Sequence, residues 1–218
     1  MNSHLLTEPY ETALAHWPAT GQVILAQHTD THVVVYQAYN PAIAAALVRA
    51  KSFHAPEVAA AGFIMTRMTW IKTNFFWMMY RSAWATSKNQ DRVVALYLKR
   101  AGFDALVAEG VLSSFDDESS RASTIDEWRV QLHQSNIRLQ WDPDHHPNGR
   151  KHATRRAIQM GVRRDALLRL SHDVVEDIVD VTDYVAAMRR GDAEEEHEWL
   201  ARLIVPIERE YTIQSTET

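Results

Sequence analysis

Short apolar runs rich in β-branched residues recur along the chain and predict strands. Two of the earliest, residues 23–26 and 32–37, are separated by a polar turn containing Asp30 and Thr31, which predicts an antiparallel hairpin. Proline has no N–H to donate within a sheet, so Pro143 is expected to end a strand at 137–141. The other runs that predict strands or extended segments are 66–72, 92–98, 155–160 and 174–181.

Helices are predicted between these runs from capping residues and helical composition. Asn40 before Pro41 provides an N-cap followed by proline at the first helical position. Residues 74–83 are apolar on all sides, as in a helix buried in a core. Thr124 and Glu127 have the spacing of a capping box. The helices expected are residues 42–51, 74–83, 124–134, 164–170 and 193–203, with another after residue 182.

The order of these elements predicts the fold class. Helices and short strands alternate irregularly, and no glycine-rich turn follows a strand, which argues against a doubly wound parallel sheet. We expect one α+β domain over residues 21–190, with short mixed or antiparallel strands and packed helices. Residues 1–20 have weak periodicity and are expected to form a loose lead-in. Residues 191–218 are expected to form a helical extension and a polar tail.

Composition narrows the classes of protein to which the chain can belong. The 218 residues include no cysteine, which excludes disulfides, thiolate metal ligands and a cysteine nucleophile. No apolar run approaches the roughly 20 residues that span a bilayer, and the first ten residues lack a signal-peptide pattern. We therefore expect a cytoplasmic protein with no membrane partner. The net charge of −5 argues against a protein that coats nucleic acid.

Residues 68–84 contain the densest group of aromatic and basic side chains. A core helix explains side chains such as Phe76 and Trp84, because aromatic residues fill protein interiors. It does not explain Lys72 and Arg81, which are costly to bury without an anionic partner. Indole rings beside these cations would suit a nucleotide, whose base stacks and whose phosphates pair with the cations. The candidate binding residues here are Arg67, Trp70, Lys72, Tyr80 and Arg81.

Residues 140–146 bring two carboxylates and two imidazoles close together, a composition that also occurs in metal sites. These groups are consecutive at a strand end, and no second cluster matches them, so no metal is expected. Gln140 and Asp142 are two positions apart and share one face of a strand, which predicts hydrogen-bonding groups that point the same way. The alternative is a solvated turn that stops at Asp142-Pro143.

Polar and aromatic residues also occur where the strand at 32–37 passes into the next helix. A ligand phosphate or amide near that helix N-terminus would meet free N–H donors. The alternative is a plain N-cap with two packing tyrosines. The candidate binding residues of this segment are Tyr36, Gln37, Tyr39 and Asn40.

The strand at 155–160 adds Arg156 as a binding candidate, with an exposed basic strand as the alternative. Gln159 points to the opposite face, so only some of these side chains can reach one site. Three common schemes are absent from the sequence: the Gly-x-Ser-x-Gly elbow, the phosphate-binding loop and the dinucleotide glycine fingerprint. Their absence argues against a serine hydrolase, a P-loop enzyme and a Rossmann dehydrogenase.

Together these motifs resemble the proteins grouped as domain of unknown function 4291, found in bacteria and fungi. The matching stretches are VYQAYN (35–40), RMTWIKTNFFWMMYRSAW (67–84), LQWDPDH (139–145), RRAIQMG (155–161) and DVTD (180–183). They span about residues 33–184, and the long Trp-rich stretch is the most distinctive. The family label carries no established activity.

The chain departs from this family at two places. Members usually open with an arginine-rich strand ahead of VYQAYN, whereas residues 23–28 here are VILAQH. If that arginine binds a substrate in other members, this protein lacks the contact, or His28 provides part of it. Thr73 stands where members often have proline.

A second resemblance is to the opening of ADP-ribosyltransferase-like folds. In these folds a strand with a polar or aromatic end leads into a helix, and a later strand carries a Gln/Glu-x-Glu pair. The resemblance implies a split sheet that binds NAD in its cleft. It also implies cleavage of the nicotinamide–ribose bond through an oxocarbenium-like transition state, which a carboxylate stabilises.

The same resemblance assigns roles to particular side chains. Gln140 and Asp142 would be the catalytic pair, with Asp142 stabilising the developing ribosyl cation. Tyr39 and Trp70 would enclose the nicotinamide, and an arginine, Arg67 or Arg81, would hold the pyrophosphate. Asp is shorter than Glu by one methylene, and a misplacement of about 1 Å can cost about a hundredfold in rate.

Three classes of function follow from these observations. The leading prediction is a nucleotide-using enzyme, either an NAD-dependent ADP-ribosyltransferase or an NAD glycohydrolase, with NAD as cofactor. The alternative is a non-catalytic domain that binds nucleic acid or nucleotide through stacking aromatic rings and cations. The third is a structural or partner-binding domain whose Trp-rich segment is only core. The sequence predicts neither the acceptor nor the oligomeric state.

Overall fold

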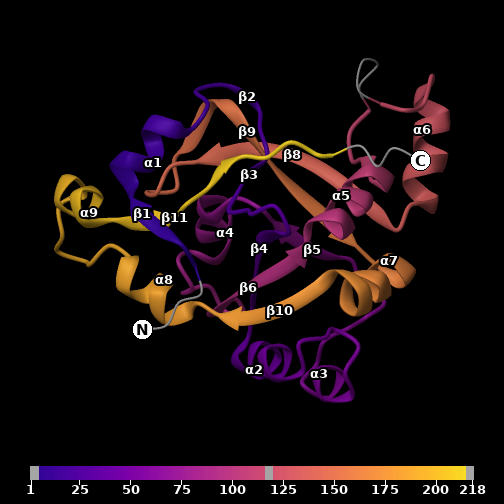
Figure 1. Ribbon diagram of the computed structural model, residues 1–218, viewed down its shortest axis with the longest axis horizontal. Coiled ribbons are helices and arrows are strands. Elements are labelled where there is room, and N and C mark those ends of the chain that lie inside the picture. The colour runs from indigo at the N-terminus through magenta and orange to yellow at the C-terminus, as the bar shows by residue number, and fades with distance from the viewer. Residues whose placement is uncertain (1–4, 116–119, 215–218) are drawn as a thin grey trace.

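The computed structural model describes residues 5–115 and 120–214, and Figure 1 shows how the elements are arranged. The strands are β1 (Thr7–Pro9), β2 (Gly21–Gln22), β3 (Leu25–Ala26), β4 (His32–Tyr39), β5 (Thr69–Lys72), β6 (Arg92–Lys99), β7 (Val111–Leu112), β8 (Ile137–His145), β9 (Lys151–Val162), β10 (Val175–Asp180), β11 (Ile204–Pro206) and β12 (Arg209–Glu210). The helices are α1 (Tyr10–His16), α2 (Pro41–Ala50), α3 (Pro56–Ala60), α4 (Phe75–Ser82), α5 (Arg100–Glu109), α6 (Ile125–Gln134), α7 (Arg164–Arg169), α8 (Thr182–Met188) and α9 (Glu196–Arg202), with a π-helical turn η1 (Leu170–Val174).

One sheet of eight strands organises the molecule. Its order is β10-β6-β4-β5-β9-β8-β7, and β2 pairs with β9 outside this path. The pairs β7–β8 and β2–β9 are parallel, and the other pairs in the sheet are antiparallel. Two short antiparallel ladders, β1–β11 and β3–β12, lie outside it. This mixed sheet with packed helices confirms the predicted α+β class.

Side chains alternate between the two faces along each strand, so each face presents apolar residues. Helices pack against both faces. One buried cluster joins strand residues such as Val35 and Leu96 to α2, α3, α5 and α7. The other joins Val34 and Ala95 to α1, α4, α8 and α9. All residues of α4 are buried except Tyr80 and Arg81, which agrees with the helix predicted at 74–83.

The helix starts follow the local capping signals. The Asn40 side chain accepts a hydrogen bond from the backbone N of Ile43 at 2.9 Å, at the start of α2. Asn74 likewise accepts from the backbone N of Trp77 at 2.8 Å, at the start of α4. Thr124 accepts from the backbone N of Glu127 at the start of α6. The N-caps predicted at Asn40 and Thr124 are therefore confirmed.

The strands β4 and β5 diverge from each other near the middle of the sheet. Their register joins them at one position, Tyr36 opposite Lys72. Farther along β4, side chains replace the backbone ladder: Gln37 Nε2 donates to Thr69 Oγ1 at 2.8 Å, and the Tyr39 hydroxyl lies 3.1 Å from the same oxygen. By contrast, β4 and β6 pair at every position from His32 to Tyr39. The sheet is therefore open between β4 and β5, and the cavity described below lies there.

One predicted strand end and one predicted strand pairing differ from the structure. The strand predicted to end before Pro143 continues as β8 to His145, with an irregularity in register between Pro143 and His145. Proline is tolerated at such an irregularity because the ladder does not require its missing N–H there. The hairpin predicted from residues 23–37 forms its turn through a bridge between His28 and Val33, but β3 pairs with β12 instead of β4.

The segments near the two ends of the chain pack against each other. Residues expected as a loose lead-in form β1 and α1, and Tyr10, Ala13 and Trp17 are buried. The ladder between β1 and β11 joins them to the C-terminal segment, as seen at the left of Figure 1. The helix predicted at 193–203 is present as the shorter α9. Within the described residues, no helix is long and apolar enough to cross a membrane.

The cap of α2 gives a test of why Asn40 is present. Replacing it in Asn40→Ala removes the side-chain acceptor, and we expect the free energy of unfolding to fall by about 1 kcal/mol. Asn40→Ser retains an acceptor, so its free energy of unfolding should fall by much less. Urea denaturation of the two variants and the wild type measures both values. Equal destabilisation by Ala and Ser would show that the cap is not the reason.

Candidate active site

A cavity of about 720 Å³ opens where β4 and β5 diverge. This volume lies within the range of pockets that bind molecules of nucleotide size. Strand β4 supplies Gln37 and Tyr39, while β5 supplies Trp70 and Lys72. The other lining residues are Ala38, Arg67, Met68, Thr69, Met78, Arg81, Asn89, Gln90, Gln140 and Gln159.

Lys72 is the most unusual group in the cavity wall. Only 5% of its surface is exposed, and in the part of the chain that the structure describes its ammonium makes no hydrogen bond or ion pair. The ring of Trp77 lies 5.9 Å from Nζ, close enough for a cation–π contact. Burial, together with the Arg81 guanidinium, lowers the pKa of Lys72 to about 8, whereas Asp142 raises it. A cation in this condition is stabilised by any anion that enters the cavity.

Arg81 adds a second positive charge from the last turn of α4, where it is exposed. With the Gln90 amide oriented to match its neighbours, Gln90 accepts from Arg81 Nη1 at 3.1 Å and donates to the Arg81 carbonyl at 3.0 Å. Both residues line the cavity, and Gln90 therefore helps to hold the guanidinium at its edge. Arg67, also exposed, is a third cation in the lining.

Asp142 is held by the two glutamines of the β8–β9 hairpin. Gln140 and Gln159 are direct partners in the register of that hairpin. Gln140 Nε2 donates to Asp142 Oδ1 at 2.8 Å, and Gln159 Nε2 donates to Oδ2 at 2.6 Å. The glutamines line the cavity, and Asp142 is bonded to both of them without being a lining residue, so its charge acts on the cavity through space, as its effect on the pKa of Lys72 indicates.

The aromatic walls of the cavity are Trp70 and Tyr39. Trp70 lies opposite Gly161 of β9, and a Cβ at Gly161 would come within 3.0 Å of the indole and 2.6 Å of the Met68 sulfur. A glycine is therefore required for both side chains to pack there. Hydrogen bonding to Thr69 fixes the Tyr39 ring, and burial raises the pKa of its hydroxyl, so the phenol stays protonated.

The structure brings together most of the predicted site residues. Gln37, Tyr39, Arg67, Trp70, Lys72, Arg81 and Gln140 line the cavity, and Asp142 adjoins it. The lining residues that sequence reasoning missed are Ala38, Met68, Thr69, Met78, Asn89, Gln90 and Gln159. Gln159 had a usable signal, since pairing the 137–141 and 155–160 strands as a hairpin places it opposite Gln140.

Four predicted binding residues lie elsewhere. Tyr36 is fully buried in the cluster on the α4 face, and Asn40 caps α2. Tyr80 is 44% exposed on the outer side of α4, where its ring stacks on His145 with the centroids 3.8 Å apart. Arg156 is exposed on β9 opposite Pro143. None of the four is among the residues that line the cavity in the described part of the chain.

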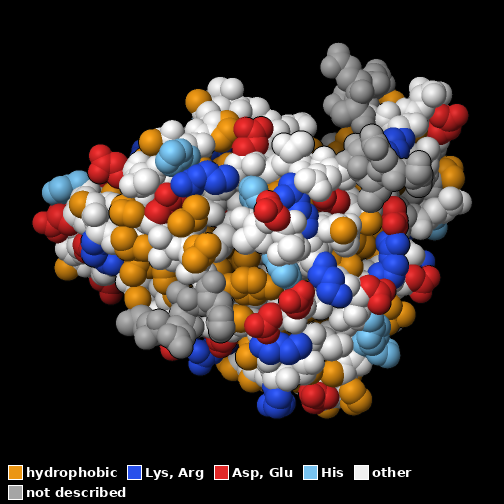
Figure 2. Space-filling view, in the orientation of Figure 1, with side chains coloured by type: hydrophobic (Ala, Val, Ile, Leu, Met, Phe, Trp, Pro, Cys, Tyr) orange, Lys and Arg blue, Asp and Glu red, His pale blue; other side chains and the backbone are white. Residues whose placement is uncertain are grey.

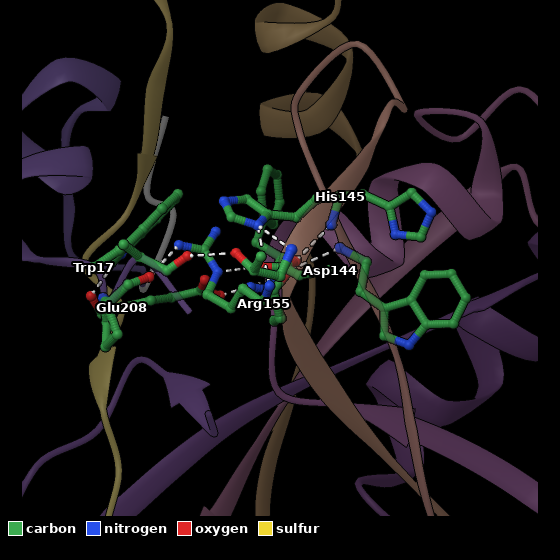
Figure 3. A network of polar contacts seen from close by, with 12 residues as sticks. Trp17, Asp144, His145, Arg155 and Glu208 are labelled. Atoms are coloured by element: carbon green, nitrogen blue, oxygen red, sulfur yellow. Dashed lines mark hydrogen bonds and ion pairs between the residues drawn. The ribbon is translucent and has the colours of Figure 1, made fainter. Parts of the chain in front are cut away.

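Two further charged residues of the β8–β9 hairpin, Asp144 and Arg155, have a structural role. Asp144 and Arg155 form a buried ion pair, with Nε 2.6 Å from Oδ2. The backbone N of His145 donates to the other carboxylate oxygen of Asp144 at 2.7 Å. Figure 3 shows this pair lying between His145 and Glu208 of the C-terminal segment. These contacts hold the end of the β8–β9 hairpin against the core.

Two further predictions concern His28 and metal binding. His28 packs edge-on to Tyr211, with ring centroids 5.1 Å apart, and does not line the cavity. Burial lowers its pKa, which disfavours the positive charge that it would need to take over the role of an arginine. Across residues 5–115 and 120–214, His, Asp and Glu side chains form no cluster that would hold a metal ion.

The fold is α+β, and a cavity with a polar and aromatic lining lies at an opening in its central sheet. The chain belongs to the family defined as a domain of unknown function (DUF4291), whose model matches residues 23–211. All the sequence motifs that suggested this family lie within that range. A search among curated proteins finds none that matches the chain.

The burial of the Lys72 charge predicts how its replacement affects stability. The apolar replacement Lys72→Met removes a buried charge whose pKa is lowered from 10.5 to about 8, so the free energy of unfolding at pH 7 should rise by about 3 kcal/mol. Between about pH 8 and 10.5 the unfolded wild type binds more protons than the folded protein, so its stability should increase with pH. The variant should lack this increase.

Chemical denaturation at pH 7, 9 and 10 measures these differences. Lys99→Met is the matched control, because Lys99 is exposed and its replacement should leave stability unchanged. A destabilised Lys72→Met protein would contradict the description of Lys72 as a buried cation without a partner.

Proposed function

We propose that the cavity is the active site of a nucleotide-using enzyme that acts on NAD, as an ADP-ribosyltransferase or an NAD glycohydrolase. The observation that carries this proposal is the buried Lys72 ammonium, which lacks an anionic partner, in a cavity that also contains aromatic rings and adjoins a carboxylate. We also propose that the enzyme is cytoplasmic, in keeping with the absence of cysteine.

The cations of the cavity suit the pyrophosphate of a dinucleotide. The Arg81 guanidinium contributes to the lowered pKa of Lys72, and both side chains line the cavity. A phosphate would replace the solvation that Lys72 lost on burial and would form charge-assisted hydrogen bonds with both groups. Arg67, the third cation of the lining, would contribute to a second phosphate group.

Trp70 and Tyr39 supply ring faces for a planar heterocycle. Stacked and edge-to-face aromatic contacts of this kind favour a ring such as nicotinamide or adenine. Trp77 is unsuited to this role because it is only 8% exposed and stacks on His145. The binding rings are therefore those at the opening of the sheet.

Asp142 supplies negative charge for the bond-breaking step. Cleavage of the nicotinamide–ribose bond produces positive charge on the ribose, and a carboxylate held in place beforehand stabilises that charge electrostatically. Gln140 and Gln159 occupy both Asp142 oxygens, so Asp142 acts as a fixed charge and not as a nucleophile. Water would accept the ribosyl group in a glycohydrolase, and a nucleophile on a second molecule would accept it in a transferase.

The distribution of charge on the surface supports nucleic-acid binding less well than it supports a nucleotide site in the cavity. On the face drawn in Figure 2, Lys and Arg side chains are interspersed with Asp and Glu side chains instead of forming one basic track. The net charge of −5 points the same way. Binding of a nucleotide without turnover is the alternative that the experiments below distinguish.

The proposal predicts separate effects on binding and on chemistry. Calorimetric titration should show that NAD binds to the wild type, and nicotinamide release should be detectable by chromatography. In Lys72→Met, loss of a charged contact should weaken NAD binding by about tenfold or more. In Asp142→Asn, binding should change by less than about threefold, while nicotinamide release should fall by about a hundredfold or more.

Lys99→Met is again the control and should match the wild type in both assays. NAD binding without nicotinamide release would support the non-catalytic alternative. If millimolar NAD gives neither heat, thermal stabilisation nor turnover, the proposal is wrong.

The pKa of Lys72 also predicts how NAD affinity depends on pH. Below about pH 8 the lysine is protonated and attracts phosphate, whereas above this value the free protein increasingly holds it neutral. NAD affinity should therefore fall as pH rises from 7 to 9.5, and the fall should be absent from Lys72→Met. An affinity that is constant over this range in the wild type would exclude Lys72 as the phosphate-binding cation.

A further inference from the structure

Gln37 presents a buried acceptor that no group in the described part of the chain uses. The residue is 2% exposed and lines the cavity. Its Nε2 donates to Thr69 Oγ1 at 2.8 Å and to the Trp70 carbonyl at 3.3 Å. Its Oε1 is buried and has no hydrogen-bond partner among the described residues.

The orientation of this amide is determined by its neighbours. A backbone carbonyl can only accept a hydrogen bond, so the amide group that faces the Trp70 carbonyl must be the nitrogen. Rotating the amide would place two acceptors against each other and would leave the nitrogen without this partner. Oε1 is therefore the amide atom that does not face the Trp70 carbonyl.

An unsatisfied buried acceptor is costly, since such a group loses about 1–3 kcal/mol of solvation without compensation. A partner that enters the cavity would remove this cost. The partner must be a donor, because Oε1 carries no hydrogen. It must also be close to a ring, because Tyr39 lies two residues along the same strand and Trp70 lies on the facing strand.

We infer that Gln37 Oε1 accepts a hydrogen bond from an N–H group attached to the heterocycle of the bound nucleotide, and thereby selects ligands that carry this donor. This inference rests on the proposed function and specifies how the same cavity recognises its ligand. Two parts of NAD have the required chemistry: the carboxamide of nicotinamide and the exocyclic amine of adenine.

Two NAD analogues separate these sources. Nicotinic acid adenine dinucleotide replaces the carboxamide by a carboxylate, and nicotinamide hypoxanthine dinucleotide replaces the adenine amine by a carbonyl oxygen. Calorimetry of the wild type should show that one of them binds at least tenfold more weakly than NAD. The analogue that is rejected identifies which ring lies beside Gln37.

The test of the residue uses Gln37→Met, which preserves side-chain length but has no amide acceptor. In this variant the difference between NAD and the rejected analogue should shrink to less than threefold. Gln37→Asn is the second variant, because its shorter side chain withdraws the acceptor while retaining an amide. Thermal unfolding of both variants verifies that they are folded.

Gln27→Met is the matched control. Gln27 is also a buried glutamine, 5% exposed, whose Oε1 has no partner among the described residues, but it does not line the cavity. This variant should retain the discrimination of the wild type.

Two results would overturn the inference while leaving the proposed function intact. One is that the wild type binds both analogues as tightly as NAD. The other is that a folded Gln37→Met or Gln37→Asn protein rejects the same analogue as strongly as the wild type. Failure of NAD itself to bind would reject the proposed function, and the inference with it.

Discussion

The separation of β4 from β5 is the constraint on which the candidate site depends. A continuous ladder between these strands would join their backbones at every position, as it does between β4 and β6. Instead, the backbones pair at Tyr36 and Lys72 only, and side chains bridge the rest of the gap. Backbone hydrogen bonds given up in the middle of a sheet must be replaced by other polar contacts. The replacement by Gln37 and Tyr39 both maintains the opening and lines it with polar groups.

The site also requires the core to tolerate an unfavourable charge. Lys72 stays in the cavity wall because the strand around it is fixed on both sides, by Tyr36 on β4 and Gln159 on β9. The helix that packs over this face, α4, is almost entirely buried and provides apolar contacts that offset the cost. Functional sites commonly retain such local instability because the remainder of the fold supports it.

The parts of the fold that sequence predicted well are those determined by neighbouring residues. The cap at Asn40, the buried helix after Asn74 and the long strand at 92–98 depend on local chemistry and periodicity. The pairing of β3 with β12 brings together residues more than 180 positions apart, and no local pattern encodes it. Pro143 misled the prediction of the strand end, because an irregularity in register that involves β9 accommodates it.

The same distinction applies to the site. Alternation along one strand placed Gln140 with Asp142, and the cost of burying charge correctly marked Lys72 as unusual, whereas Arg81 is exposed. Tyr36 and Gln37 are adjacent, and only the structure separates the packing residue from the cavity residue. For Arg156 and Gln159, sequence alone shows that they face opposite ways but not which face adjoins the cavity.

The joining of the two ends of the chain affects how the protein is made. Strand β1 pairs with β11, and the Trp17 indole donates to the backbone carbonyl of Glu208, 191 residues later. During synthesis on the ribosome, the first residues emerge long before these partners exist. Contacts between residues so distant in sequence slow folding. Strand edges that are still unpaired before their partners are synthesised promote aggregation. Residues 7–17 can therefore reach their final place only after residues 204–208 have been translated.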